Sequence, residues 1–325
     1  MLLVVPQGSE NRPGRRGLGG GDPEEERRHA GLEGGGAPVP LTDLQRQLLA
    51  LLARSRESDG YLAGGTAIHL ASASSRFSED LDFFHDSAEA VAESFARDSA
   101  VLEAAGYRVQ VRLSQPGFIQ AIVETDDQEA TRIDWAHDSA WRFMPLASDE
   151  MGGLLLHEID LAINKVLTLA GRDEARDFVD ILYVHEHILP LGALIWAAVA
   201  KDPGFTPASL LEQLKRRGRY RPEEIDRIEL AAPLDLVEAK AAWRTALSDA
   251  DKFIRERPHD EVGCLYYSPS RDCFVAPFPG ISLAEQGLVP HFGQSGGILP
   301  AVRGQSHPST ESGEVPGRQG ATKGK

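Results

Sequence analysis

The chain has 325 residues, of which 42% are hydrophobic and 26% charged, enough for one sizeable core or two modest domains. Its 34 Lys and Arg residues against 49 Asp and Glu give a net charge of −15, which excludes a protein that coats nucleic acid by bulk positive charge. Two cysteines exclude a disulfide framework and a four-cysteine zinc site. No apolar run approaches the ~18 residues that span a membrane, so we expect a cytoplasmic protein without membrane contact.

Both ends of the chain are predicted to be disordered. Residues 7–38 hold many Gly, Pro and charged residues but almost no large apolar side chain, and the tail is similar. Such stretches bury too little surface to offset the entropy that is lost on ordering. We therefore predict disorder over 1–38 and 294–325 and place the function between them.

The region after residue 38 alternates between helical and strand patterns. Thr42 and Gln45 have the spacing of a capping box, and leucines follow at helical spacing. The elements predicted next are a glycine turn with a helical turn at 64–71, a strand at 80–85, a helix at 88–105, and strands at 107–113, 118–123 and 131–136. This order is typical of a small mixed sheet, which we place at 39–150.

From residue 151 the pattern becomes helical. Helices are predicted at 157–170, 174–186, 191–201, 207–216 and 234–255. A hairpin-like piece lies within an extension over 258–293, and we expect Cys264 and Cys273 to face each other across it as reduced thiols. The predicted fold class is α/β (α+β), with a small mixed sheet followed by a helical domain at 151–257.

The strand at 80–85 carries two aspartates on one face. Because side chains alternate along a strand, Asp80 and Asp82 project together while Leu81 and Phe83 face the core. Two like charges about 7 Å apart repel each other unless a cation lies between them.

A third aspartate is predicted to join them. Asp134 faces away from Ile133 and Trp135 on its strand, so it converges with Asp80 and Asp82 if the two strands are neighbours. Three hard oxygen ligands suit Mg²⁺ and fit a two-ion site that clamps the attacking and leaving oxygens of a phosphoryl displacement. The alternative is three solvent-facing strand residues, but Asp is depleted in strands.

The turn Gly64-Gly65-Thr66 supplies a complementary feature. Two glycines allow a positive φ and a close approach of phosphate to the backbone, and the helical turn that follows offers free N–H groups. Thr66 can add a hydroxyl. Most such tripeptides are only tight turns, so this prediction depends on the spacing to Asp80 and Asp82.

Two stretches resemble a known family. GGTAIHLASASSRFSEDLDFF, at 64–84, resembles the first motif of the nucleotidyltransferase superfamily and, within it, of AbiEii/AbiGii-type abortive-infection toxins. NKVLTLAGRDEARDFVDI, at 164–181, is similar to a second pattern of that family. The residues at matching positions are Arg76 and Ser78 in the first stretch, and Lys165, Arg172, Arg176, Asp177 and Asp180 in the second. The resemblance covers roughly residues 40–190.

The resemblance implies a DNA polymerase β-like nucleotidyltransferase core that uses an NTP and two Mg²⁺ ions. The implied metal ligands are Asp80, Asp82 and Asp134, and with Lys165 and Asp177 they form the implied catalytic set. The implied nucleotide-binding residues are Gly64, Gly65, Thr66, Arg76, Ser78, Lys165 and Arg176. Members are toxins of toxin–antitoxin pairs, and some add nucleotides to the 3′ end of tRNA, which implies tRNA or another RNA as a candidate acceptor and a cognate antitoxin as a candidate partner.

The second stretch also has a physical interpretation. On a continuous helix, Lys165, Arg172 and Arg176 would fall within about 40° of one another and form a cationic stripe suited to phosphate oxygens. If Gly171 breaks the helix, two helices face the site instead. The alternative is solvated helix charge, with Arg176 and Asp180 as an i,i+4 pair.

The segment 215–221, KRRGRYR, is a dense basic cluster. The candidate RNA-binding residues are Lys215, Arg216, Arg217, Arg219 and Arg221. Tyr220 would stack on a base. The alternative, weighed evenly, is a helix C-terminus whose cations complement the dipole, with Gly218 as its cap. An acidic antitoxin could also dock here.

These features predict an Mg²⁺-dependent nucleotidyltransferase of the toxin type, which moves a nucleotidyl group to an acceptor hydroxyl and releases pyrophosphate. Two other interpretations stay open: a catalytically silent module that holds a nucleotide or partner, and a transferase that modifies a small molecule such as an aminoglycoside. Intact Asp80, Asp82 and Lys165 favour catalysis. No P-loop, G-x-S-x-G or G-x-G-x-x-G motif supports another class of enzyme.

Overall fold

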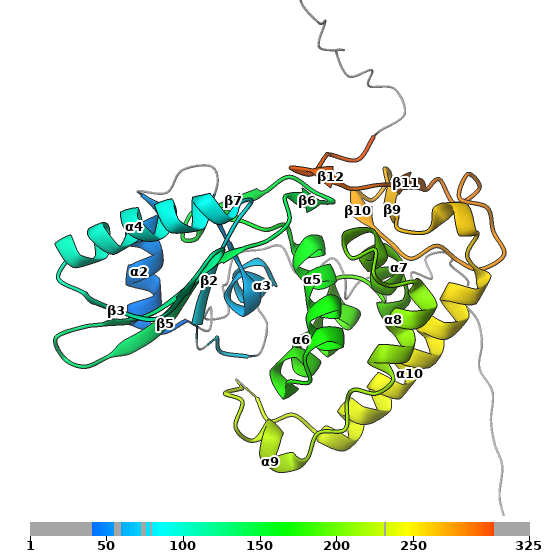
Figure 1. The fold of residues 1–325 in the computed structure, drawn as a ribbon. Helices are drawn as coiled ribbons and strands as arrows, with labels where there is room; N and C mark the ends of the chain where they lie inside the picture. The colour runs from blue at the N-terminus through cyan, green and yellow to red at the C-terminus, as the bar shows by residue number, and fades with distance from the viewer. Residues whose placement is uncertain (1–40, 55–59, 73–75, 79, 231, 302–325) are drawn as a thin grey trace, which may run out of the picture. The chain divides into compact units, whose positions relative to one another are not determined.

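The computed structural model describes residues 41–301 apart from 55–59, 73–75, 79 and 231 (Figure 1). The predicted disorder of 1–38, and of the tail beyond residue 301, lies outside these residues. The described residues belong to one compact unit, in which the sheet, the helical part and the C-terminal extension pack against one another.

A mixed sheet forms the first half. Within the described residues it has seven strands in the order β3-β4-β5-β2-β1-β8-β7. They are β1 (Gly60–Ala63), β2 (Asp80–His85), β3 (Arg108–Gln115), β4 (Phe118–Glu124), β5 (Ala130–His137), β7 (Ala147–Asp149) and β8 (Gly153–Leu155). β2 pairs with β5 in parallel and with β1 in antiparallel. The sequence did not predict β7 and β8, because three residues give no readable alternation.

Three helices pack against this sheet. They are α2 (Asp43–Ala53), α3 (Gly64–Ser72) and α4 (Ala88–Ala104). The predicted capping box begins α2, since Thr42 accepts from the Gln45 backbone and Gln45 accepts from the Thr42 backbone. α4 covers β2 to β5, and α2 packs beside it. Trp135 of β5 points into this layer, where its Nε1 donates to Asp98 of α4 at 2.8 Å.

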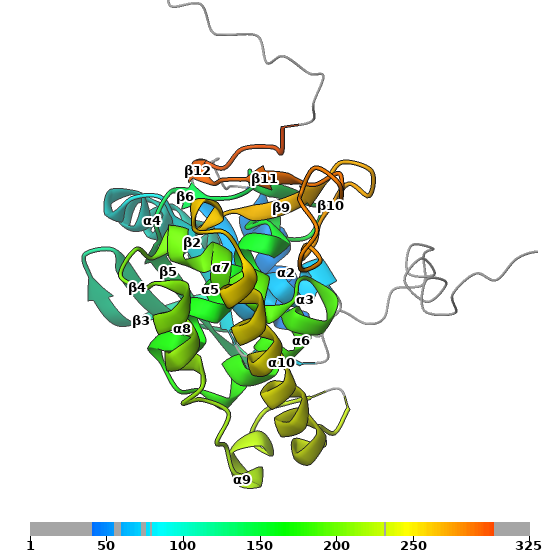
Figure 2. The same cartoon turned by 90° about the vertical axis from the view of Figure 1, so that its right-hand side faces the viewer.

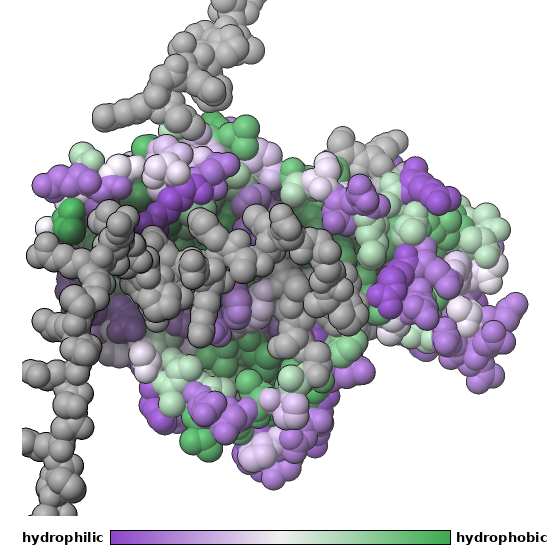
Figure 3. All heavy atoms as spheres, turned by 180° about the vertical axis from the view of Figure 1, so that it is seen from behind, coloured by the Kyte–Doolittle hydropathy of each residue, from purple (hydrophilic) through white to green (hydrophobic). Residues whose placement is uncertain are grey.

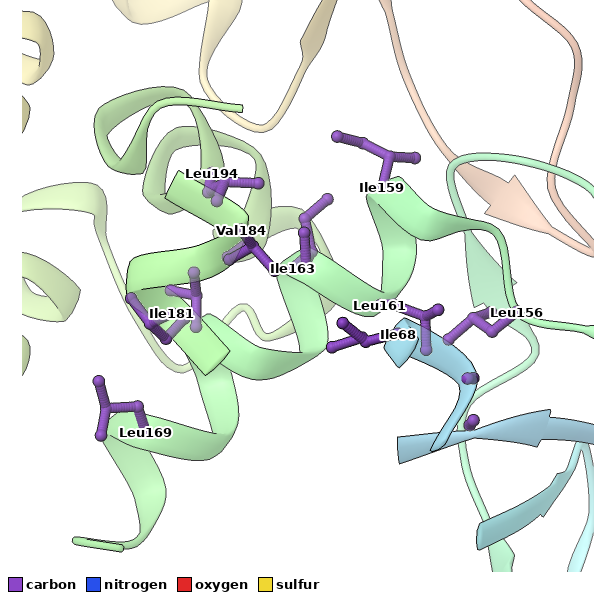
Figure 4. Close-up of a cluster of buried hydrophobic side chains, with 14 of the residues drawn as sticks. Ile68, Leu156, Ile159, Leu161, Ile163, Leu169, Ile181, Val184 and Leu194 are labelled. Atoms are coloured by element: carbon purple, nitrogen blue, oxygen red, sulfur yellow. The ribbon is translucent and has the colours of Figure 1, made fainter. Parts of the chain in front are cut away.

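The helical half is built around one central helix, α5. Its elements are α5 (Glu158–Gly171), α6 (Ala175–His187), α7 (Leu191–Lys201), α8 (Pro207–Leu214), α9 (Pro222–Ile225), α10 (Leu236–Glu256) and a 3-10 turn at His259–Glu261. α5 contacts α3 on one side and α6 and α7 on the other, and α10 packs along α7 (Figure 2). Figure 4 shows the apolar side of α5, where Leu161 meets Ile68 of α3 and Ile163 lies near Val184 of α6. This packing holds α5 against the sheet half.

The C-terminal extension ends with a strand on the sheet half. Its strands are β9 (Leu265–Ser268), β10 (Cys273–Phe274), β11 (Val289–His291) and β12 (Gln294–Ser295), and β12 pairs with β6 (Trp141–Arg142). The prediction of disorder from residue 294 is therefore wrong for Gln294 and Ser295. Their partner strand lies about 150 residues earlier in the chain, and pairing over such a distance leaves no local signal in the sequence.

The extension also corrects the cysteine prediction. Both cysteines are free, as expected, but they do not face each other. Cys273 is exposed and pairs with Ser268, whereas Cys264 is buried just before β9. The hairpin-like piece is present as β9 and β10, joined by a turn in which Arg271 N donates to Ser268 O at 3.1 Å.

The lengths and apolarity of the helices bear on whether the chain spans a membrane, and the hydropathy of one face describes its surface. No single helix in the described ranges is both long and apolar enough to cross a membrane; α6 and α7 reach that length only as a pair bent by 113°. The face seen from behind is mixed, with hydrophilic residues beside hydrophobic ones across the coloured surface (Figure 3).

Candidate functional site

The register of β2 and β5 brings the acidic residues together. In this parallel pair Asp82 lies opposite Asp134, and Asp80 lies opposite Arg132. Opposite residues on adjacent strands point to the same face of a sheet. Because Trp135 points into the α4 layer, all three carboxylates lie on the other face, towards α5.

Gly64 begins α3 directly against Asp82. Its φ is +65°, and a Cβ at this position would lie 1.8 Å from Asp82 Oδ2. At Gly65 a Cβ would lie 2.5 Å from Arg76 Nη2. Both positions therefore require glycine for close approach, and the first also requires it for the backbone conformation.

Two predicted nucleotide-binding hydroxyls contact Asp80. Thr66 is fully buried, and its Oγ1 donates to the Asp80 carbonyl at 2.7 Å. Ser78 Oγ lies 3.1 Å from the same carbonyl and 3.4 Å from Asp80 Oδ1. Neither side chain lines the cavity described below. In this structure both hydroxyls contact Asp80, and their predicted nucleotide contact stays a prediction.

A buried ion-pair network joins the two halves of the protein. Arg76, before β2, donates to both carboxylate oxygens of Asp180 on α6, at 2.9 and 3.1 Å. Lys165 of α5 lies 2.7 Å from Asp180 and 3.4 Å from Asp177. All four side chains are buried, so the loss of any one partner leaves an uncompensated charge.

Asp177 lies behind the site rather than in it. It is fully buried, and Arg172 holds it through two hydrogen bonds of 2.7 and 3.2 Å. Asp177 does not line the cavity, whereas Lys165 and Arg172 do. Asp177 thus contacts both of these cations, and its predicted catalytic role stays a prediction.

The cationic stripe is not on one continuous helix. α5 ends at Gly171, Arg172 has an extended backbone, and α6 begins at Ala175. The two helices face the site separately, which was the stated alternative. Arg176 then pairs with Glu174 at 2.7 Å and approaches Asp80 at 3.5 Å, rather than forming the i,i+4 pair with Asp180.

A cavity of about 420 Å³ lies between the carboxylate face and α5, within the usual range for ligand pockets. Its wall on the sheet side comprises Gly64, Gly65, Asp80, Asp82, Phe84, Arg132, Asp134 and Asp138. Its wall on the helical side comprises Leu161, Asn164, Lys165, Leu167, Thr168, Arg172, Arg176 and Lys201, and Arg76 lies between the two. An acidic floor thus faces a basic wall.

Arg132 is a site residue that the sequence prediction missed. Its guanidinium is hydrogen-bonded to Asp80, and its Nε lies 3.6 Å from Asp134 Oδ1. Asp134 Oδ1 also accepts from Gln120 Nε2 at 3.0 Å. Arg132 stands two residues before Asp134 on the same strand, so the alternation that selected Asp134 also pointed to Arg132.

Two carboxylates of the floor, those of Asp82 and Asp134, have raised pKa values. Burial raises the pKa of Asp82 to about 6; Lys165 acts in the opposite direction, and the neighbouring charge of Asp134 raises it further. Burial likewise raises the pKa of Asp134, against the hydrogen bond from Gln120. A cation in the cavity would relieve both effects.

The structure does not itself assemble a metal cluster. Among the described residues, no group of three His, Cys, Asp or Glu side chains is arranged to hold a metal ion. Arg132 pairs with Asp80 and lies 3.6 Å from Asp134, so a guanidinium contacts both carboxylates.

Comparison with known proteins identifies the family. The profile of the AbiEii family, described as a nucleotidyl transferase toxin of a type IV toxin–antitoxin system, matches residues 47–262, about two thirds of the chain. The chain belongs to the AbiEii family. It is therefore a nucleotidyltransferase of a toxin family.

Solved structures with a similar fold have low sequence identity. JHP933 from Helicobacter pylori is 19% identical, with a TM-score of 0.43 over 68% of this chain and 97% of that one. The MenT4 nucleotidyltransferase toxin from Mycobacterium tuberculosis H37Rv is 19% identical, with a TM-score of 0.47 over 67% and 83%. A putative nucleotidyltransferase from H. pylori is 19% identical, with a TM-score of 0.42 over 66% and 97%. No curated protein matches this sequence.

In this AbiEii protein part of the predicted RNA cluster is engaged in contacts within the protein. Tyr220 is buried and donates to Asp173 at 2.6 Å, so the prediction that it stacks on a base is wrong. Arg217 donates to the Ala170 carbonyl at 2.6 Å, and Lys215 pairs with Glu212 at 2.6 Å.

The rest of the cluster follows the end of α8. The helix is capped by Lys215, so Gly218, with φ +81°, lies three residues beyond the cap and is not the expected cap itself. Arg216, Arg219 and Arg221 remain exposed, and Arg221 lies 3.6 Å from Glu224. A polyanion can reach these three, and Lys215 is also exposed although it is paired with Glu212.

Proposed function

We propose that this AbiEii protein transfers a nucleotidyl group from an NTP to an acceptor hydroxyl, and that it uses Mg²⁺ and an RNA acceptor. One observation carries the proposal: Asp82 and Asp134 lie in register on the floor of a cavity whose opposite wall presents Lys165, Arg172 and Arg176. A polyphosphate needs such cations, and a divalent ion needs such carboxylates.

The donor set fits Mg²⁺ in its chemistry. Asp80, Asp82 and Asp134 are hard oxygen donors on one face, and the raised pKa of Asp82 is what a carboxylate without its cation would have. These three residues would hold the ion once Arg132 releases Asp80. Bound Mg²⁺ would supply charge neutralisation between the carboxylates and the phosphates.

The protein's own groups then divide the reaction between them. Lys165 and Arg176 bind phosphate oxygens, and the backbone N–H groups at Gly64 and Gly65 add donors at the start of α3. Asp134, turned by Gln120, accepts the proton of the acceptor hydroxyl. The hydroxyl oxygen bonds to the α-phosphorus, the bond from that phosphorus to the bridging oxygen breaks, and pyrophosphate leaves with the electron pair.

The RNA acceptor is the finer part of the proposal. The overall charge of −15 disfavours RNA binding over the whole surface, so contact must be local. Arg216, Arg219 and Arg221 offer three accessible cations for a phosphate backbone. The type IV family description also supports a cognate antitoxin as a partner.

The test is a transfer assay. Purified protein is incubated with each labelled NTP, total RNA and Mg²⁺, and labelled RNA is resolved on a gel. We expect labelling by the wild type, none by Asp82→Asn, and normal labelling by the control Asp126→Asn in the exposed β4–β5 turn. No labelling with any NTP, or equal labelling by Asp82→Asn, would reject the proposal. Labelling only when an aminoglycoside replaces RNA would reject the acceptor.

A further inference from the structure

The two ends of the cavity differ in chemistry. Along β2 the residues on the cavity face are Asp80, then Asp82, then Phe84, each about 7 Å beyond the last. Arg176 approaches Asp80 at 3.5 Å and Arg132 pairs with it, so these two cations lie at the Asp80 end. Phe84 lies at the other end, away from the groups that would bind phosphates.

α5 shows the same gradient on the opposite wall. Leu161 and Asn164 line the cavity from its N-terminal turns, and Lys165 follows. Arg172 stands just beyond its C-terminus. Leu161 thus lines the cavity nearest the N-terminus of this helix, Asn164 and Lys165 lie side by side near its middle, and Leu167, Thr168 and Arg172 follow towards its C-terminus.

The apolar end has a fixed aromatic surface. Phe84 packs edge-to-face against the buried ring of Tyr61, with 6.3 Å between the ring centroids and 74° between the planes. Leu161 lies beside Ile68 and Leu156 in the buried apolar cluster (Figure 4). A flat group entering this end would meet an aromatic and an aliphatic surface that are already in place.

Asn164 adds a polar group to this surface. Its backbone carbonyl accepts from Thr168 Oγ1 at 2.8 Å, but its side-chain amide has no hydrogen-bond partner among the described residues. The nearby charges, in contrast, are satisfied: Lys201 pairs with Asp138 at 2.8 Å. A half-buried amide that offers one acceptor and two donors is suited to the polar edge of a base.

We propose that this end is the nucleobase subsite for the NTP, in which the base packs on Phe84 and Leu161 and the Asn164 amide reads its polar edge. The inference rests on the proposed function, since it assigns a binding site to the base of the NTP, whereas the cations bind the phosphates. Stacking of a base on an aromatic ring gives affinity for every base, whereas hydrogen bonds from an amide distinguish between them.

The experiment measures binding without an acceptor. Titration calorimetry with Mg²⁺ and each of ATP, GTP, CTP, UTP and inorganic tripolyphosphate separates the contribution of the base from that of the phosphates. Phe84→Leu should weaken all four NTPs by roughly ten-fold, from the lost stacking. Asn164→Leu should reduce the spread among the four NTPs by about five- to ten-fold, from the lost hydrogen bonds. Tripolyphosphate should bind both variants as it binds the wild type.

The controls keep the inference separate from the proposed function. Gln213→Leu removes an amide on α8 that donates to the Ala170 carbonyl outside the cavity, and it should leave every affinity unchanged. Thermal unfolding checks that Phe84→Leu is folded. Two results in the Phe84→Leu and Asn164→Leu variants would overturn the subsite. One is an equal loss of affinity for the NTPs and for tripolyphosphate, and the other is no change in either affinity. A wild type that binds neither ligand would instead reject the proposed function.

Discussion

Asp82 of β2 and Asp134 of β5 are direct neighbours on parallel strands, and the charge of Asp134 is one cause of the raised pKa of Asp82. Two carboxylates placed in this way cost folding energy when both are ionised. Four predictions follow from this pair and from the groups that touch it.

Asp82→Asn should stabilise the protein at neutral pH. The folded pKa of Asp82, about 6, lies above its unfolded value of 3.8, so the stability that Asp82 contributes is present below pH 4 and is lost as the pH rises through 6. The variant should gain roughly 1–3 kcal/mol in free energy of unfolding at pH 8, and little near pH 4. Urea unfolding at both pH values measures this difference, with Asp126→Asn as the control. A loss of stability at pH 8 would contradict it.

Binding of a divalent ion should weaken as the pH falls through about 6. A proton and the ion compete for the Asp82 carboxylate, and below its pKa each pH unit costs up to about ten-fold in affinity. Calorimetric titration with Mn²⁺ at pH 5, 6, 7 and 8 measures the trend. An affinity that stays constant over this range would show that Asp82 is not a ligand.

Arg132→Gln should bind Mn²⁺ more tightly than the wild type. The guanidinium of Arg132 is paired with Asp80 and lies near Asp134, so an ion must displace it before these carboxylates become available. We expect the affinity for Mn²⁺ to rise roughly five- to ten-fold, because a partly exposed ion pair contributes about 1 kcal/mol. The matched control is Arg112→Gln, which removes the same charge from the exposed edge of the sheet on β3. Equal or weaker binding by Arg132→Gln would reject the competition.

Gly64→Ala should abolish transfer, whereas Gly287→Ala should not. Both glycines have φ +65°, so both substitutions carry the same backbone strain. Only the first places a Cβ 1.8 Å from Asp82 Oδ2, because nothing lies within 4 Å of the Cβ position at Gly287. The transfer assay and Mn²⁺ binding compare the two variants. Normal Mn²⁺ binding by Gly64→Ala would contradict the close contact between Gly64 and Asp82.

The acidic floor could be predicted from the sequence because it depends on local periodicity. Asp80, Asp82 and Asp134 each lie on a strand long enough for alternation to assign the face, and the parallel pairing of β2 with β5 then brings them together. The capping box at Thr42 is readable for the same reason, since its partners are three residues apart.

The directions of the supporting side chains could not be predicted. Thr66 and Ser78 belong to a motif that favours phosphate contact, yet both hydroxyls bond to the Asp80 carbonyl. Whether a hydroxyl bonds to a phosphate or to this carbonyl depends on the tertiary structure, which the local sequence does not specify. The pairing of Arg76 with Asp180 spans 104 residues and depends on how α6 meets the sheet half. The sequence alone could not decide whether the helix breaks after Gly171, because a single glycine is compatible with the interior of a helix or with its end.

The C-terminal extension bears on how the protein should be produced. The family match ends at residue 262, but the chain beyond it supplies β12, whose approach leaves no room for a side chain at Gly293, where a Cβ would lie 2.6 Å from Trp141. An expression fragment trimmed to the family boundary would strip β6 of its partner strand and uncover the indole of Trp196, which packs against this segment. Recombinant work should therefore retain the chain at least through Ala301.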